Sequence, residues 1–184
     1  MMISFKDKKD FKSWLKENHD ECPGIWMRLF KKGSGEVSIN YQEALEEALC
    51  YGWIDGQRKS HDEKSFLQKF TPRRAKSIWS KRNTHIVQNL IADGRMKAPG
   101  LKAIDEAKAD GRWDAAYDSP KNMLLPEEYL KIIKRNKKAY AYYKTLSKSK
   151  LYAIAFRIQT AKKEETRLNR LSVIIEMLEK QAFV

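Results

Sequence analysis

The sequence predicts an α+β fold: a small antiparallel or mixed sheet with packed helices, followed by an all-helical C-terminal part. Three observations lead to this prediction. Alternation typical of strands occurs only up to Pro72, and apolar residues recur at helical spacing both before and after that point. Beyond Pro126 no strand pattern returns, and the apolar stripes are all helical.

The first elements are expected to be helix, strand and helix. Asp7 is a suitable N-cap for a helix whose apolar face carries Phe11, Trp14 and Leu15. Residues 24–30 predict a strand with large side chains on both faces, so we expect both faces to be covered. Asn40, with Glu43 three residues later, predicts a capping box at the start of the next helix.

Two further strands and two helices complete the first part. Gly52 and Gly56 flank a short extended element, and residues 65–71 alternate as a strand. After Pro72 an apolar stripe predicts a helix that Gly94 ends; the stripe is formed by Trp79, Asn83, Ile86 and Leu90. A shorter helix is expected to run on to Gly111.

The remainder of the chain predicts helices alone. Pro126 suits the first turn of a helix, and three stripes follow: Leu130 and Ile133; Leu151, Ile154, Ala155 and Ile158; Leu168, Leu171, Ile175 and Leu178. Glu164 and Arg167 fall at helical neighbour spacing and predict an ion pair. Because residues 119–122 resemble a linker, we expect two domains, residues 1–118 and 119–184.

Composition excludes several classes of protein. The 184 residues are 42% hydrophobic and 11% aromatic, which excludes a disordered chain. No stretch approaches the roughly 20 apolar residues of a membrane-spanning helix, and residues 1–16 lack the apolar run of a secretory signal. Two cysteines without a CxxC motif indicate reduced thiols. We therefore expect a soluble cytoplasmic protein with a formal net charge of +13.

Two long runs of unlike residues are distinctive: residues 41–56 (YQEALEEALCYGWIDG) and residues 70–83 (FTPRRAKSIWSKRN). Together with residues 94–96, 99–101, 111–113 and 161–170, they resemble the YdeI/OmpD-associated family, a similarity that spans nearly the whole chain. The resemblance implies a bacterial cytosolic protein linked to envelope stress or bacteriocin protection, with a C-terminal OmpD-associated helical module. It implies no reaction, substrate or cofactor.

Polar and aromatic residues around the predicted strand-to-helix corner suggest a pocket for a small anionic or polar ligand. Arginine side chains fit carboxylates and phosphates, hydroxyls near a helix start add donors, and tryptophan rings stack on planar groups. The candidate residues are Trp53, Asp55, Arg73, Arg74, Ser77, Trp79, Ser80 and Asn83. A structural interpretation stays open, in which the tryptophans are core, the serines are caps and Asp55 pairs with Arg73. We expect four of these residues to converge: Trp53, Asp55, Arg73 and Trp79.

Other chemistry has weaker support. Residues 31–35 (KKGSG) lack the ending of a phosphate-binding P-loop and are better interpreted as a solvated connection. His19 and Cys22 form HxxC without the spacing of a four-ligand site, so we expect no metal and no cofactor. Cys50 ends an apolar stripe, which favours an inert buried thiol over a nucleophile. No catalytic order is readable, and whether the chain is an enzyme stays open.

The basic C-terminal part suggests an alternative function in non-sequence-specific nucleic-acid binding. Lys121 to Arg170 contain 14 basic and 4 acidic residues, interleaved with tyrosines. The candidate phosphate contacts are Lys134, Arg135, Lys137 and Lys138. An anionic membrane surface would attract the same charges, and a solvated lysine face over buried tyrosine rings is the structural alternative. The sequence leaves the ligand and the oligomeric state open.

Overall fold

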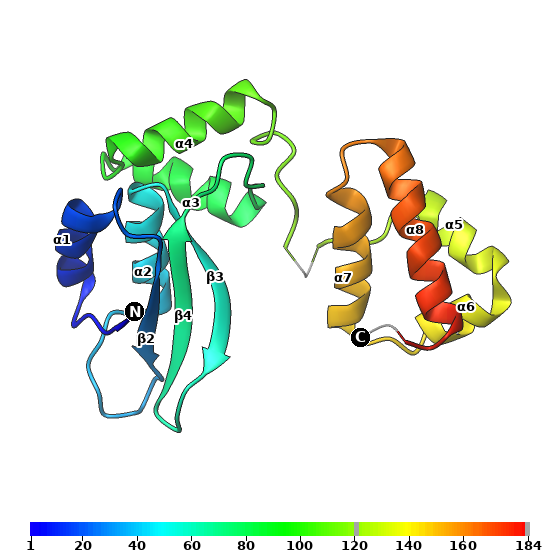
Figure 1. The fold of residues 1–184 in the computed structure, drawn as a ribbon, viewed down its shortest axis with the longest axis horizontal. Coiled ribbons are helices and arrows are strands. Elements are labelled where there is room, and N and C mark those ends of the chain that lie inside the picture. Colours follow the sequence, from blue (N-terminus) through cyan, green and yellow to red (C-terminus); the bar gives the residue numbers. More distant parts are fainter. Residues whose placement is uncertain (120–121, 183–184) are drawn as a thin grey trace. The chain divides into compact units, whose positions relative to one another are not determined.

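A computed structural model describes residues 1–119 and 122–182. The chain forms two compact units, and Figure 1 shows their helices and strands. The first unit comprises Met1–Trp79 and Asn83–Ala116, and the second comprises Ser80–Arg82 and the chain from Tyr117 onward. Residues 120 and 121 of the expected linker lie outside the described residues. The first unit combines a mixed sheet with helices and the C-terminal part is helical, so the α+β prediction is confirmed.

The helices and strands before Tyr117 follow the predicted order, with one addition. They are β1 (Met2–Ile3), α1 (Lys8–Asn18), β2 (Ile25–Phe30), α2 (Tyr41–Cys50), β3 (Trp53–Ser60), β4 (Ser65–Pro72), α3 (Lys81–Ala92) and α4 (Ala98–Ala109). The sheet order is β1-β2-β4-β3, with β1 parallel to β2 and the other pairs antiparallel. The sequence does not predict β1, because two residues are too few for an alternation to be seen.

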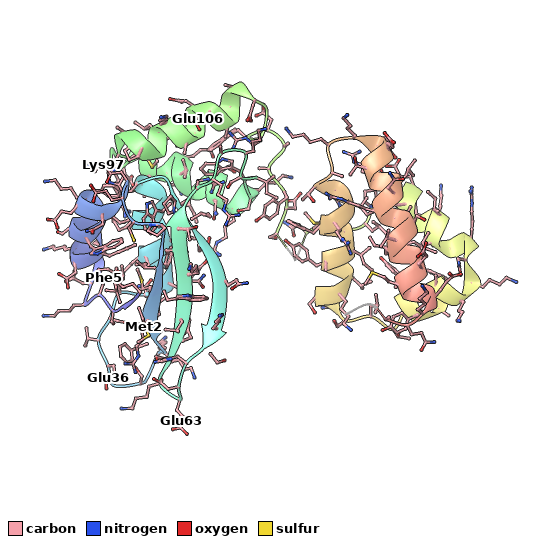
Figure 2. All side chains as sticks on the ribbon, in the orientation of Figure 1. Met2, Phe5, Glu36, Glu63, Lys97 and Glu106 are labelled. Carbon is pink, nitrogen blue, oxygen red and sulfur yellow. The ribbon has the colours of Figure 1, made fainter. Side chains whose placement is uncertain are left out.

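The first two helices start at the predicted N-cap residues, Asp7 and Asn40. The Asp7 carboxylate accepts hydrogen bonds from the backbone of Lys9 and Asp10 at 2.7 and 3.1 Å. Asn40 and Glu43 form the reciprocal capping box, with bonds of 3.0 and 3.1 Å. Both helices then bury their apolar faces against the sheet, where Phe11 and Leu15 of α1 are fully buried. Phe5, labelled in Figure 2, packs its ring 4.9 Å from that of Phe11.

The two faces of the sheet are covered to different extents. Along β2, burial alternates strictly: Ile25, Met27 and Leu29 are buried, while the residues between them are half-buried. The expectation that large side chains would cover both faces of this strand is therefore wrong. On the less covered face the described residues form no second core. Cationic side chains lie over the aromatic rings there and keep their charged groups in water.

The less covered face, called the open face below, follows from the strand register. Residues directly opposite one another share a face, so Trp26 of β2 lies beside Lys69 of β4. The open face comprises Trp26, Arg28, Phe30, Ile54, Lys59, Ser65, Leu67, Lys69 and Thr71. The ammonium groups of Lys59 and Lys69 lie 4.6 and 5.2 Å from the centroid of the Trp26 ring. The Arg28 guanidinium lies 4.6 Å from the Phe30 ring.

The start of α4 lies directly on the last carbonyl groups of α2. The Lys97 backbone N–H donates to the Cys50 carbonyl at 3.1 Å. Gly100 is buried at this crossing, where an added Cβ would lie 2.8 Å from the Leu49 carbonyl oxygen and closer still to that of Cys50. The two helices can approach this closely because residue 100 has no side chain.

Arg95 links the end of α3 to α2 through two carboxylates. Its guanidinium lies 2.8 Å from Glu46 and 2.7 Å from Glu47, and the Glu47 side chain is only 7% exposed. Burial alone would raise the pKa of Glu46, but hydrogen bonds from Gln42 and Arg95 outweigh it and leave that pKa below its ordinary value. The carboxylate form of Glu46 is therefore favoured by folding.

Acid is expected to weaken the first unit partly through Glu46. Because the folded pKa is lowered, this contribution is present above the unfolded pKa of about 4.3 and is lost as the pH falls through the folded pKa. Urea unfolding from pH 7 to pH 3 measures this loss. Glu46→Gln should flatten the dependence, whereas Glu17→Gln, at an exposed position of α1, should leave it as steep as in the wild type. An equally steep dependence in Glu46→Gln would contradict the assignment.

The described C-terminal part contains α5 (Glu127–Arg135), α6 (Lys137–Tyr143), α7 (Lys148–Gln159) and α8 (Glu164–Glu179). Pro126 is the N-cap of α5, one residue before the first turn in which it was expected. The Glu164–Arg167 ion pair is confirmed at 3.4 Å. In α8 the buried stripe is Leu171, Ile174 and Leu178, and the predicted Leu168 is 45% exposed. None of the described helices combines the length and apolarity needed to cross a membrane.

Candidate functional site

A cavity of about 370 Å³ lies at the end of the open face where β3 and β4 meet the corner loop, which we define as residues 73–79. Its lining combines apolar and cationic side chains with backbone from the edge strand. The lining residues are Trp26, Ile54, Asp55, Gly56, Gln57, Lys69, Thr71, Pro72, Arg74 and Ser77. We refer to it as the open-face cavity.

Three strands and a loop position these groups. Trp26 and Lys69 are cross-strand neighbours, and Ile54 pairs with Thr71 one strand further on. The corner loop adds Arg74 and Ser77, whose backbones close a turn through a 3.0 Å hydrogen bond. The Ser77 carbonyl also accepts from the buried Arg112 guanidinium at 2.9 Å, which anchors the loop.

Positive charge around the cavity is not neutralised by ion pairs. Within residues 1–119 and 122–182, no carboxylate lies within 4.0 Å of the charged nitrogens of Lys59, Lys69 or Arg74. The one acid in the lining, Asp55, accepts a 2.6 Å hydrogen bond from the Tyr41 hydroxyl. The cavity is therefore suited to an anion, with an aromatic ring beside the charges.

The structure divides the predicted site residues between different places. Asp55, Arg74 and Ser77 line the open-face cavity together. Trp53 and Arg73 line another cavity of about 290 Å³, with Asp20, Lys102 and Glu106 among its other residues. Ser80 directly precedes α3, and Asn83 is buried on that helix at 8% exposure; neither lines the open-face cavity. Ligand binding by these residues stays a prediction.

The two candidate tryptophans are core residues. Trp53 is 1% exposed, donates its indole N–H to the His19 carbonyl at 2.9 Å and meets the Trp14 ring edge-on. Trp79 is 2% exposed and carries the Arg73 guanidinium over its ring at 3.7 Å. Of the four residues expected to converge, Arg73 lies over the Trp79 ring and lines one cavity with Trp53, whereas Asp55 lines the open-face cavity and accepts a hydrogen bond from Tyr41. Trp79, buried beneath the Arg73 guanidinium, offers no open ring face to a ligand.

Sequence reasoning missed Trp26, Lys69 and Lys59. The alternation within residues 24–30 does indicate that Trp26 faces away from Ile25 and Met27. Which lysines lie beside it depends on the pairing of β2, β4 and β3, which the sequence does not specify. The missing information is the register.

Cys50 is the inert thiol that its position predicts. It is 1% exposed, and burial raises the pKa of its thiol to about 11. At pH 8 the reactive thiolate is therefore a very small fraction of the population. We expect iodoacetamide to modify the half-buried Cys22 in the native protein, and to modify Cys50 only after unfolding. Peptide mass spectrometry with and without denaturant checks this, and rapid native labelling of Cys50 would contradict it.

The remaining candidates have structural contacts. The Lys31 ammonium donates to the carbonyls of Asp62 and Glu63 at 3.2 and 2.9 Å, which ties residues 31–35 to the tip of the β3–β4 hairpin, marked by Glu63 in Figure 2. Cys22 approaches the Gly24 carbonyl through its sulfur. In the part of the chain that the structure describes, no three His, Cys, Asp or Glu side chains gather as metal ligands.

The basic residues of the C-terminal part are exposed. Lys134 and Arg135 end α5, Lys137 and Lys138 begin α6, and all four side chains face solvent. Lys134 forms an ion pair with Glu127 at 3.1 Å. The Tyr140 and Tyr143 rings stack 6.3 Å apart and are half-buried against the helical core. This arrangement agrees with a solvated basic face over tyrosine rings and leaves nucleic-acid binding as a prediction.

Comparisons with known proteins identify two regions. Residues 3–103, more than half of the chain, match a family described as "Domain of unknown function (DUF8412)". Residues 122–181 match the family described as "Bacteriocin-protection, YdeI or OmpD-Associated". No curated protein and no solved structure matches the chain. The resemblance drawn from the sequence is thus confirmed for the C-terminal part, while residues 41–56 and 70–83 fall in the other match. The chain belongs to the DUF8412 family and carries a YdeI/OmpD-associated region at its C-terminal end.

Proposed function

We propose that the first unit binds a small anionic ligand in the open-face cavity. The observation that carries this proposal is a group of three cations that form no ion pairs in the described chain: Lys69 and Arg74 line the cavity, and Lys59 lies beside the ring of the lining residue Trp26. Held together without counter-ions, such charges repel one another, and an anionic ligand relieves that repulsion.

Six of the ten lining residues have a chemical role in this proposal. Arg74 presents a planar fork of donors to an oxyanion, and Lys69 supplies a point charge. The Ser77 hydroxyl adds a neutral donor. Trp26 and Ile54 bury the apolar part of the ligand, and the Asp55 carboxylate, oriented by Tyr41, accepts from a ligand hydroxyl.

Two other cavities lined by described residues of the first unit are less suited to an anion. The cavity of about 290 Å³ is lined by Arg73 and Lys102 but also by Asp20 and Glu106, so its charges balance. A third cavity, of about 240 Å³, includes Arg95, which is already paired with Glu46, and adds the acidic Asp93. A volume of about 370 Å³ also falls within the usual range of small-molecule sites, roughly 300–1,000 Å³.

Thermal unfolding at constant ionic strength tests the proposal. Inorganic phosphate, benzoate and phenyl phosphate are added separately, and at least one should raise the Tm of the wild type because it binds the native state alone. Arg74→Gln should reduce the rise, while Arg82→Gln, outside the cavity lining, should not. The proposal fails if none of the three anions raises the Tm of the wild type.

We further propose that this protein is cytoplasmic and has a role in bacteriocin tolerance. The support for the role is the description of the family matched by residues 122–181, which names bacteriocin protection. Survival of a deletion strain under bacteriocin challenge, complemented by wild type or by a cavity variant, measures it. Equal survival of the deletion and wild-type strains would contradict the role.

A second candidate function is nucleic-acid binding by the C-terminal part. The exposed Arg135, Lys137 and Lys138 at the α5–α6 junction favour it, because three neighbouring cations can contact phosphates without base readout. Neutralising them together with Lys134 should weaken binding to unrelated sequences alike and flatten the salt dependence. Fluorescence anisotropy with a labelled duplex and a labelled single strand measures this. No binding at low salt would reject it.

A further inference from the structure

We infer that the ligand of the open-face cavity is a phosphate monoester with an apolar body, an inference that rests on the proposed anion binding. It adds the chemical class of the ligand to the general preference for an anion. Three features of the cavity lead to it: the excess of positive charge, the position of the two lysines on one ring, and the apolar floor.

The charge of the cavity matches a dianion. The lining contributes two positive charges, Lys69 and Arg74, and one negative charge, Asp55; with Lys59, which lies beside the Trp26 ring of the lining, the excess is two positive charges. A phosphate monoester carries about −1.5 to −2 at pH 7. A carboxylate, a sulfate ester or a phosphodiester carries a single negative charge and would leave one cation without a partner.

The two lysines are placed to share one ligand group. Their ammonium nitrogens lie 4.6 and 5.2 Å from the centroid of the same Trp26 ring, so both charges lie beside one aromatic side chain of the cavity lining. A phosphate offers three terminal oxygens, enough for both lysines and for the Arg74 fork at once. A carboxylate has only two oxygens for the same three cations.

The remaining lining suits an organic body rather than a bare ion. Trp26 and Ile54 from the strands and Pro72 at the end of β4 give the cavity an apolar surface beside the charges. Inorganic phosphate would leave this surface in contact with water. An aryl or alkyl group attached to the phosphate would cover it and gain hydrophobic binding energy.

Isothermal titration calorimetry with phenyl phosphate, phenyl sulfate and inorganic phosphate tests the inference. At pH 7.5 phenyl phosphate should bind about tenfold tighter than phenyl sulfate, the equivalent of one charge-assisted hydrogen bond. At pH 5 this preference should shrink, because the second pKa of the phosphate is about 6. Phenyl sulfate is the control, since its own charge is constant and any change in the protein affects both ligands. Lys69→Gln should reduce the preference, and Lys12→Gln on α1 should not.

The outcomes separate the inference from the proposed function. Equal affinities for phenyl phosphate and phenyl sulfate would overturn the inference and leave anion binding intact. If inorganic phosphate binds as tightly as phenyl phosphate, the inference that the ligand has an apolar body is overturned. If a 5′-phosphorylated dinucleotide binds more tightly than phenyl phosphate, the inference of a small ligand is overturned, and the cavity binds the end of a nucleic-acid strand. No binding of any of these anions would overturn both the inference and the proposed function.

Discussion

Gly100→Ala is expected to destabilise the first unit by about 3 kcal/mol, the upper end of the usual cost of overpacking. The added methyl group would lie 2.8 Å from the Leu49 carbonyl oxygen and would also collide with that of Cys50. Both partners are backbone atoms at the end of α2, so no side-chain rotation can relieve the clash. The α2–α4 crossing must widen, which also strains the hydrogen bond from Lys97 to Cys50.

Thermal and urea unfolding measure this effect. A loss of about 3 kcal/mol corresponds to a fall in Tm on the order of 10 °C or more for a unit of this size. Gly56→Ala is the matched control, because its Cβ would meet only ordinary contacts, the nearest at 3.5 Å to Lys69. A Gly100→Ala variant that melts within about 2 °C of the wild type would show that the crossing adjusts freely.

The double variant Lys69→Ala, Arg74→Ala is expected to weaken anion binding about 100-fold. Each substitution removes one charge-assisted hydrogen bond to the ligand, which contributes roughly 1.5–3 kcal/mol, and each 1.4 kcal/mol is a factor of ten in affinity. Its Tm without ligand should stay close to that of the wild type, because Lys69 is half-buried, Arg74 is exposed, and their charges repel one another.

The control for this variant is Lys12→Ala, Lys16→Ala, which removes the same net charge from exposed positions of α1. Titration calorimetry with phenyl phosphate compares the two double variants with the wild type. A general electrostatic effect would weaken binding equally in both, and that result would contradict a site at the open face. A loss confined to the cavity variant is the expected outcome.

Helix starts and ends were predictable because they depend on residues close together in the sequence. The Asp7 cap, the Asn40–Glu43 capping box and the Gly94 stop each involve a few neighbouring residues. The same holds for the Glu164–Arg167 pair. The two-residue strand β1 was not predictable, because it exists only through its pairing with Trp26 and Met27.

The candidate site was predictable only in part. The residue types of Asp55, Arg74 and Ser77 indicate a polar site, and the structure places all three around one cavity. The residue types of Trp53 and Trp79 indicate the same site, but both are core residues, because a tryptophan in a core and one in a pocket have the same sequence signature. Trp26 and Lys69 came together only through the β2–β4 register, which no local pattern encodes.

A ¹H–¹⁵N correlation spectrum recorded during titration with phenyl phosphate tests most directly whether the open-face cavity is the anion site. We expect progressive shifts of the Trp26 indole N–H and of the Lys69 and Thr71 amides, while the signal of the buried Trp53 indole N–H stays in place. Trp26→Phe identifies the indole signal. Shifts confined to residues 134–138, or no shifts at saturating ligand, would contradict the account.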